Sequence, residues 1–166
     1  RSDIVNVRVL PHFGAAYHFV LNNQRKPFND PRVRRAIHLA VSRQNLIKAF
    51  ATQEFITMSR WVSHANLFAM KAEELAKLPG YRESKDEDVA AARKLLAEAG
   101  YADGFEAELM TADVAPHAQI MAPAFQEELR RTLNIRTKIR PLERAILNDF
   151  LTKGDYDIQL SVSWGS

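Results

Sequence analysis

The sequence contains no cysteine, and this absence excludes several classes of protein at once. A chain without thiols has no disulfide framework, no thiolate metal site and no cysteine nucleophile. It also has no apolar run near the roughly 18 residues that a membrane-spanning helix requires. Internal repeats, low-complexity tracts and flexible linkers are missing too. What remains is the composition of an ordinary globular chain.

Catalytic signatures are absent as well. The sequence has five histidines: His12, His18, His38, His64 and His117. None of them stands at a metal-ligand spacing from another histidine or from a carboxylate on a helix. There is no glycine-rich phosphate loop and no nucleophile elbow. The paired acids Glu127–Glu128 and the run at residues 86–88 are interpreted as solvated helix faces. We therefore expect no enzyme, no catalytic residue, no metal and no cofactor.

The length and composition that are present fit one domain. The chain has 166 residues, of which 46% are hydrophobic and 26% charged, so it is long enough to bury most of its apolar surface. It begins at Arg1 without a methionine or a signal peptide, and we expect it to be a piece of a longer protein. We treat residues 1–166 as a single α/β lobe.

Positive charge is concentrated between Arg25 and Lys48, where seven Lys or Arg residues face only Asp30. One interpretation is a basic nucleic-acid-associated module built on the helices of residues 32–48, with phosphate contacts. The other is the solvated face of two helices. We favour the second, because no aromatic residue interleaves with the cations to stack on bases. A hydrolase lobe is a third, weaker alternative.

The segment that follows Asp30 predicts a helix with a defined start. Asp30 is suited to cap the free N–H groups, and Pro31 fits the first helical position. Apolar residues then recur on one helix face: Val33, Ala36, Ile37, Ala40 and Val41. Ser42 is a second cap before a second helix with Leu46, Ile47 and Phe50 on one face. This pair is interpreted as a scaffold.

The remaining periodicity predicts an α/β fold. Strands are expected at residues 4–10, 15–21, 105–110, 135–139 and 156–164, and helices at residues 71–77, 86–99, 116–132 and 143–152. Residues 52–70 show neither period. The last sixty or so residues read β-α-β-α-β, an order typical of parallel strands joined by covering helices. We expect a mixed sheet flanked by helices. Ligands of such sheets bind beyond the carboxyl ends of the strands, here at residues 111–117 and after Trp164.

The same segments carry a family resemblance. Asn22 heads a stretch whose Phe-x-Asp-x-Arg-Val-Arg-x-Ala-Ile core, at residues 28–37, resembles the signature of the family 5 extracellular solute-binding proteins. Three later pieces agree in order and spacing: Leu-Pro-Gly-Tyr at residues 78–81, residues 91–105, and Gly-Asp-Tyr-Asp-Ile at residues 154–158 followed by Trp164-Gly165. The match covers nearly the whole chain.

This resemblance implies a fold, a function and partners. The fold is a lobe of the periplasmic binding protein type II kind, mostly the C-terminal one. The function is capture of a peptide or other small polar ligand between two lobes, for import by an ABC transporter. The partners are the ligand, the permease subunits and a missing N-terminal lobe, with no nucleic acid. The implied location is periplasmic or extracellular, and the protein would associate with the membrane through the transporter.

The resemblance also implies a ligand site. In relatives, the loop after the matching strand and the residues around the matching tryptophan face the cleft between the lobes. The ligand-binding residues expected here are Trp164, Ser163, Gly165, Thr111, Asp113, Val114 and His117. Trp164 is either a wall of the cleft or a core residue on the face of Ile158, Leu160 and Val162. We favour the cleft wall on the strength of the resemblance.

Overall fold

A computed structural model describes residues 15–49 and 70–164 of the chain. Along these residues the elements run β1 (Ala15–Leu21), α1 (Pro31–Ala40), α2 (Arg43–Ala49), α3 (Ala72–Leu75), α4 (Asp86–Glu98), β2 (Glu106–Ala112), α5 (Pro116–Leu133), β3 (Arg136–Leu142), α6 (Arg144–Lys153) and β4 (Ile158–Trp164). The predicted strand at residues 4–10, Phe50, the segment of residues 52–69 and Gly165 lie outside the described residues.

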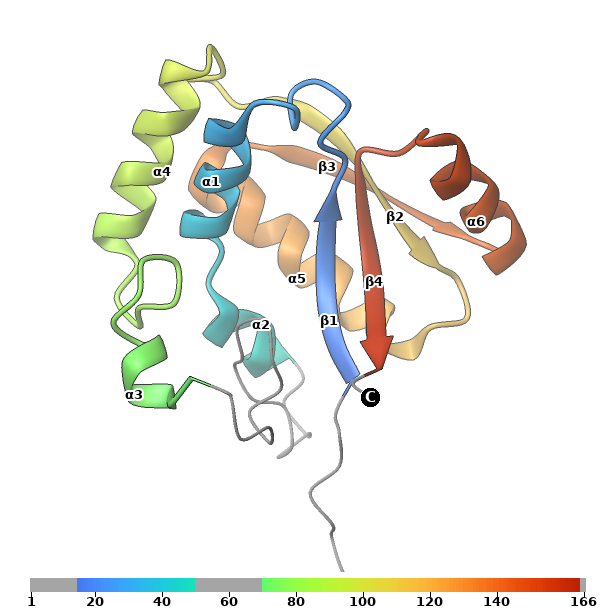
Figure 1. The fold of residues 1–166 in the computed structure, drawn as a ribbon, viewed down its shortest axis with the longest axis horizontal. Coiled ribbons are helices and arrows are strands. Elements are labelled where there is room, and N and C mark those ends of the chain that lie inside the picture. The colour runs from blue at the N-terminus through green and yellow to red at the C-terminus, as the bar shows by residue number, and fades with distance from the viewer. Residues whose placement is uncertain (1–14, 50–69, 165–166) are drawn as a thin grey trace, which may run out of the picture.

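The four strands form one mixed sheet in the order β1-β4-β2-β3 (Figure 1). β2 pairs in parallel with β3 and with β4, whereas β1 pairs antiparallel with β4. The β-α-β-α-β order from β2 to β4 is therefore confirmed. So is the parallel relation between the strands around residues 105–110 and 156–164. All three parallel strands end at the same edge of the sheet.

The start of α1 follows the predicted capping. The Oδ1 atom of Asp30 accepts a hydrogen bond of 2.8 Å from the Arg32 amide, and Pro31 occupies the first turn. The predicted apolar face is buried throughout: Val33, Ala36, Ile37, Ala40 and Val41. The second cap is confirmed too, since Ser42 Oγ accepts from the Asn45 amide at 3.3 Å. Local sequence thus sets where both helices begin.

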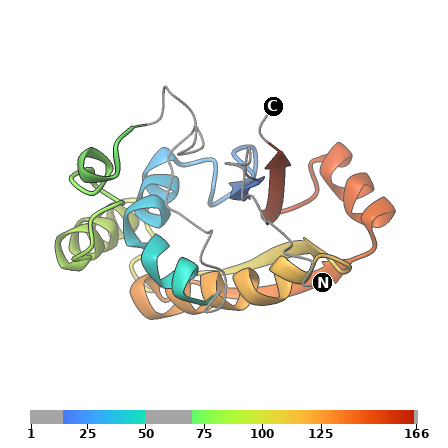
Figure 2. The same cartoon turned by 90° about the horizontal axis from the view of Figure 1, so that it is seen from below.

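Helix α5 covers one face of the sheet. Figure 2 shows α5 running along the sheet. Helices α1, α2 and α4 are stacked beside it, and α6 lies on the side of the molecule opposite these three helices. The Phe125 ring on α5 stacks on the Phe19 ring of β1, with centroids 3.7 Å apart. Met121, Phe125 and Leu129 are all buried, as their spacing predicts. Burying this stripe against the strands places the main core between α5 and the sheet.

Asn22, at the head of the signature, joins two distant parts of the chain. Its Nδ2 donates to the carbonyls of Gly154 at 2.9 Å and Tyr156 at 2.8 Å, and its Oδ1 accepts from the Gln24 amide at 3.1 Å. The side chain is buried. Asn22 therefore holds the turn that leads into β4 beside the end of β1, which confirms that it ties loop backbone together.

Two details of the sequence interpretation are wrong. Asp88 and Glu128, interpreted as solvated, are 2% and 5% exposed. They are buried because each accepts hydrogen bonds from a neighbouring segment, Asp88 from the Gly80 amide and Glu128 from the Ser42 amide. On α6, Ile146 lies off the covered face and is 47% exposed. Leu147 fills that face, and a residue one position earlier points about 100° away from it.

Candidate functional site

The carboxyl ends of β2, β3 and β4 meet at one edge of the sheet, and we call this the carboxyl edge. The Asp113 amide, just beyond β2, donates to the Leu142 carbonyl at the end of β3 at 2.9 Å. The end of β4, at Trp164, belongs to the same edge because β4 runs parallel to β2. In open α/β sheets this edge is where loops and helix starts present groups to a ligand.

The start of α5 lies close to the end of β4. Across the antiparallel pair, Tyr17 of β1 is opposite Val162, and Ala15 is opposite Trp164. The Tyr17 ring contacts the His117 ring in the first turn of α5, with centroids 4.9 Å apart and a tilt of 46°. The backbone of residues 162–164 and the first turn of α5 thus meet at the carboxyl edge. The side chains of Ser163 and Trp164 lie outside the described part of the structure.

The four expected residues of the loop differ in exposure. Thr111 is only 3% exposed, because β2 continues through Ala112 and includes it. The loop therefore starts later than predicted, whereas Pro116 opens α5 as predicted. Val114 is 74% exposed and Asp113 is exposed, while His117 is half-buried. Asp113, Val114 and His117 are available to a ligand, whereas Thr111 supports them from within the sheet.

The protonation of His117 is set by its surroundings. Burial lowers its pKa below the usual range, and the positive charge of Arg144 lowers it further. The imidazole is therefore neutral at pH 7 and offers one donor and one acceptor nitrogen. No side chain caps the start of α5; Pro116 has no N–H, and the Ala118 amide donates to the Ala115 carbonyl at 2.8 Å.

Two residues at the carboxyl edge were missed by sequence reasoning. Arg144 follows β3, the remaining parallel strand. The rule that ligands bind beyond the carboxyl ends of such strands was applied to β2 and β4, and it finds Arg144 when it is applied to β3 as well. Tyr17 carried no such signal. Its place depends on the pairing of β1 with β4, which brings together residues far apart in the chain.

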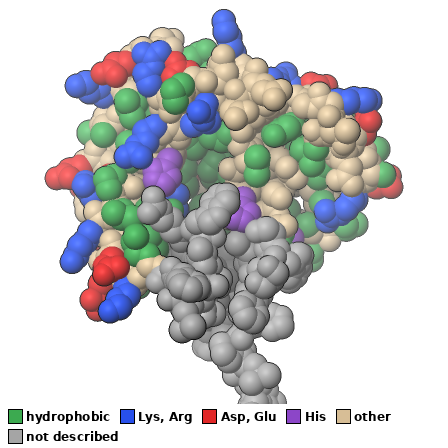
Figure 3. Space-filling model, viewed as in Figure 1, with side chains coloured by type: hydrophobic (Ala, Val, Ile, Leu, Met, Phe, Trp, Pro, Cys, Tyr) green, Lys and Arg blue, Asp and Glu red, His purple; other side chains and the backbone are tan. Residues whose placement is uncertain are grey.

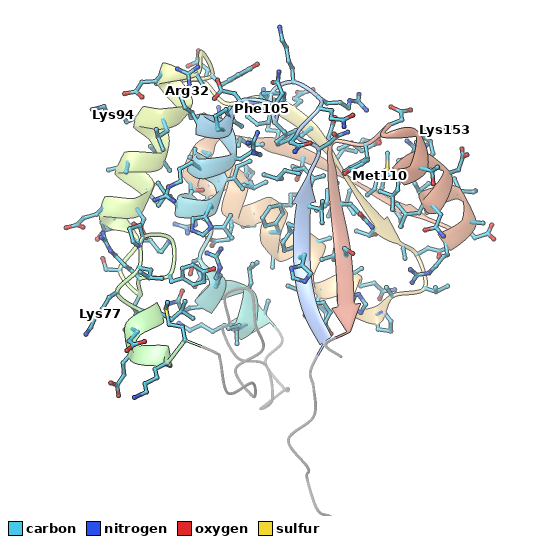
Figure 4. All side chains as sticks on the ribbon, in the orientation of Figure 1. Arg32, Lys77, Lys94, Phe105, Met110 and Lys153 are labelled. Atoms are coloured by element: carbon cyan, nitrogen blue, oxygen red, sulfur yellow. The ribbon has the colours of Figure 1, made fainter. Side chains whose placement is uncertain are left out.

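The helices that suggested nucleic-acid binding use several cations internally. Arg32 pairs with Asp30 and donates to the Glu98 carbonyl at 2.7 Å, so it lies between the start of α1 and the end of α4 (Figure 4). Arg34 donates to the Phe28 carbonyl at 2.7 Å, and Arg43 to that of Gly80 at 2.6 Å. On the face seen in Figure 3, blue and red side chains are interspersed around the rim. This distribution does not favour a phosphate-binding patch.

The described residues hold neither a metal-binding cluster nor a membrane-spanning helix. No group of three or more His, Asp or Glu side chains within residues 15–49 and 70–164 is placed to hold a metal ion. Across the same ranges, no helix has the length and apolar character needed to cross a bilayer.

Comparison with known proteins gives one family. Residues 5–166 match the model of the bacterial extracellular solute-binding proteins, family 5, middle region. The glutathione-binding protein GsiB of Salmonella choleraesuis (strain SC-B67) is 29% identical over 127 residues, which are 74% of this chain and 22% of GsiB. The periplasmic oligopeptide-binding protein OppA of Salmonella typhimurium is 33% identical over 102 residues, or 61% of this chain and 18% of OppA.

Solved structures agree on the fold. The murein tripeptide-binding protein MppA of Escherichia coli superimposes with a TM-score of 0.77 at 22% identity, over 93% of this chain and 30% of MppA. The α/β sheet flanked by helices is therefore that of a lobe of periplasmic binding proteins. The chain spans less than a quarter of the length of the curated relatives that it matches.

Proposed function

Because this chain belongs to the family 5 bacterial extracellular solute-binding proteins, a family that binds solutes without transforming them, we propose that it is one lobe of a two-lobed ABC-importer binding protein. In this proposal the ligand is a peptide or another small polar molecule, held between the carboxyl edge and a second lobe. The location is the periplasm or the cell exterior, and the partner that receives the ligand is an ABC permease.

The arrangement of the carboxyl edge is the observation that carries this proposal. The loop after β2, the turn after β3 and the start of α5 converge there, with one anion (Asp113), one cation (Arg144) and a neutral imidazole (His117) beside an exposed Val114. Mixed polar and apolar groups of this kind suit a zwitterionic or amide-rich ligand. The names of GsiB, OppA and MppA, which refer to glutathione, oligopeptides and a murein tripeptide, support a peptide-like ligand.

Trp164 and Gly165 complete the site in this proposal. An indole at the end of β4 adds a flat apolar surface with one N–H donor, well suited to flank a peptide backbone. Ser163 and Gly165 contribute hydrogen-bonding groups on either side of it. Closure of two lobes over the ligand would then exclude water and strengthen each polar contact.

Replacing Trp164 by alanine in the complete gene product is expected to weaken ligand binding by roughly 30-fold, about the 2 kcal/mol typical of a buried aromatic anchor at a binding site. The urea midpoint should stay nearly unchanged, because the indole would face the ligand rather than the core. Titration calorimetry with the ligand, together with urea unfolding, measures both quantities.

Tyr101→Ala is the control for this experiment. Tyr101 lies before β2, at the opposite end of the sheet from the carboxyl edge, where its ring packs edge-on against Phe105. This variant should lose stability and keep its affinity. A Trp164→Ala variant that loses stability and keeps its affinity would place the indole in the core, and the proposed site would be wrong.

The 166-residue chain by itself is expected to fold but to bind no small ligand tightly. A site formed by one lobe leaves half of the ligand in water, so the contacts that it makes remain screened. Calorimetry against a panel of di-, tri- and tetrapeptides should show no binding at micromolar concentrations. Micromolar affinity of the single chain would contradict a site shared between two lobes.

A further inference from the structure

His38, on α1, contacts a different chemical group with each ring nitrogen. Its Nδ1 lies 3.2 Å from Nη2 of Arg43, and its Nε2 lies 3.3 Å from the carbonyl oxygen of Pro79. A guanidinium only donates hydrogen bonds, and a carbonyl only accepts them. Nδ1 must therefore be the bare acceptor nitrogen and Nε2 must carry the proton. Both bonds form together only when His38 is neutral.

The groups around His38 form a close junction between two parts of the fold. Arg43 also donates to the Gly80 carbonyl at 2.6 Å, and its guanidinium lies 4.2 Å from the centre of the Tyr81 ring. The His38 ring meets the Tyr81 ring edge-on at 5.5 Å. Gly80, at φ +89°, approaches so closely that a Cβ there would lie 2.5 Å from His38 Nε2. This junction joins helices α1 and α2 to residues 79–88.

The charges that face His38 are mostly positive. They come from Arg35 on α1, Arg43 on α2 and Lys85 just before α4. The nearby anion, Asp88, is engaged by the Gly80 amide at 2.8 Å and by Lys85 Nζ at 3.2 Å. Burial lowers the pKa of His38 below its usual range, and Arg43 lowers it further, while the Pro79 carbonyl acts in the opposite direction. A proton on Nδ1 would set an N–H against a guanidinium.

We propose that His38 is a proton-operated latch: the neutral ring accepts a hydrogen bond from Arg43 and so holds that guanidinium on the Gly80 carbonyl. Protonation of Nδ1 repels the guanidinium and weakens its bond to Gly80, while Nε2–H still donates to the Pro79 carbonyl. The change is local. Glu128 of α5 accepts from the Ser42 amide at 3.0 Å and from Asn45 Nδ2 at 2.9 Å, and neither bond involves His38. Helix α2 therefore stays bound to α5, and Gln44 Nε2 still donates to the Tyr81 carbonyl at 3.2 Å, so the change is confined to Arg43 and the Gly80 carbonyl.

The direction of the pH effect follows from the protonation states. The neutral ring is the bound form, so the folded pKa lies below the value of about 6.5 in the unfolded chain. The contribution of the latch to stability is then fully present above pH 6.5 and declines as the pH falls below it.

Nitrogen-detected NMR of the histidine rings in the full chain tests the latch directly. We expect the Nε2–H tautomer of His38 at pH 7.5 and a titration midpoint below 6.5. The Gly80 amide signal should shift with that same midpoint, while the Ser42 amide signal should not follow it. A midpoint at or above 6.5, the Nδ1–H tautomer, or a Gly80 amide that ignores the titration of His38 would each overturn the proposal.

Two variants test the cause. Arg43→Gln removes the guanidinium and should raise the titration midpoint of His38. His38→Gln keeps one donor and one acceptor without a titratable group, so the pH-dependent shift of the Gly80 amide should disappear. His117→Gln is the control, since His117 lies at the carboxyl edge, and it should leave the Gly80 shift intact. If the pH-dependent shift of the Gly80 amide persisted in His38→Gln, another titrating group would cause it and the proposal would be wrong. If His38→Gln does not fold, the wild-type titration and Arg43→Gln still decide the question.

Discussion

Replacement of Gly104 by alanine is expected to lower the free energy of unfolding by more than about 4 kcal/mol, a loss large enough to leave much of the chain unfolded. Gly104 has φ +76°, and a Cβ there would overlap the carbonyl of Asn134. Backbone atoms cannot move aside as a flexible side chain would. The bond from Asn134 Nδ2 to the Asp103 carbonyl, at 2.6 Å, holds the two turns in this close contact.

Gly100→Ala is the matched control. Gly100 has a similar φ of +88°, but nothing lies within 4 Å of the position that a Cβ would take. Only the cost of a left-handed residue remains there, about 1 kcal/mol. Urea unfolding of both variants at pH 7 separates the two effects. Equal losses would show that the turns at Gly104 and Asn134 separate easily, which contradicts the close approach described above.

Asp88→Ala is expected to lower the free energy of unfolding by about 3–5 kcal/mol. The Asp88 side chain is 3% exposed and pairs with Lys85, which is itself only 12% exposed. Without the carboxylate, the buried Gly80 amide loses its acceptor, and Lys85 keeps only the Gly80 carbonyl as a partner. Both groups would remain desolvated with fewer compensating bonds, which is the costly way to break a buried pair.

Glu87→Ala, one residue earlier, supplies the comparison. The Glu87 side chain is 85% exposed and forms a surface ion pair with Arg82 at 2.7 Å. Truncating such a residue changes stability by about 0.5 kcal/mol or less. Thermal and urea unfolding of the two variants should therefore differ widely. Similar unfolding midpoints for the two variants would show that Asp88 is solvated, as its sequence context suggests, and would contradict the buried pair.

Local patterns predicted the elements of the fold well, because each rests on contacts between near neighbours. The start of α1 depends on Asp30 and Pro31, and the buried face of α5 on spacing within one helix. The left-handed residue after α4 is Gly100, as a helix C-terminus favours. The parallel order of β2, β3 and β4 followed from the alternation of strands and helices.

Long-range partners were not predictable in the same way. Asp88 lies in a run of acids that is typical of a solvated first turn, and only the position of Gly80 shows that it is buried. Tyr17 reaches the carboxyl edge because β1 lies beside β4, a pairing that no local pattern records. The carboxyl edge is expected from the strand order. Its cation, Arg144, follows β3, and the rule for strand ends was applied only to β2 and β4.

Because Ala15 pairs with Trp164, we expect the last steps of folding to be slow relative to the first. Almost the whole described chain lies between these two residues, so joining them closes a very long loop at a high entropic cost. By contrast, β2, α5 and β3 follow one another directly with short connections, and we expect them to form an early nucleus. Strand β1 is then expected to dock after β4 is in place, and the contact of Tyr17 with His117 would form with it. On this order the carboxyl edge is completed at the end of folding, so a chain caught before that step would have its core without a finished carboxyl edge.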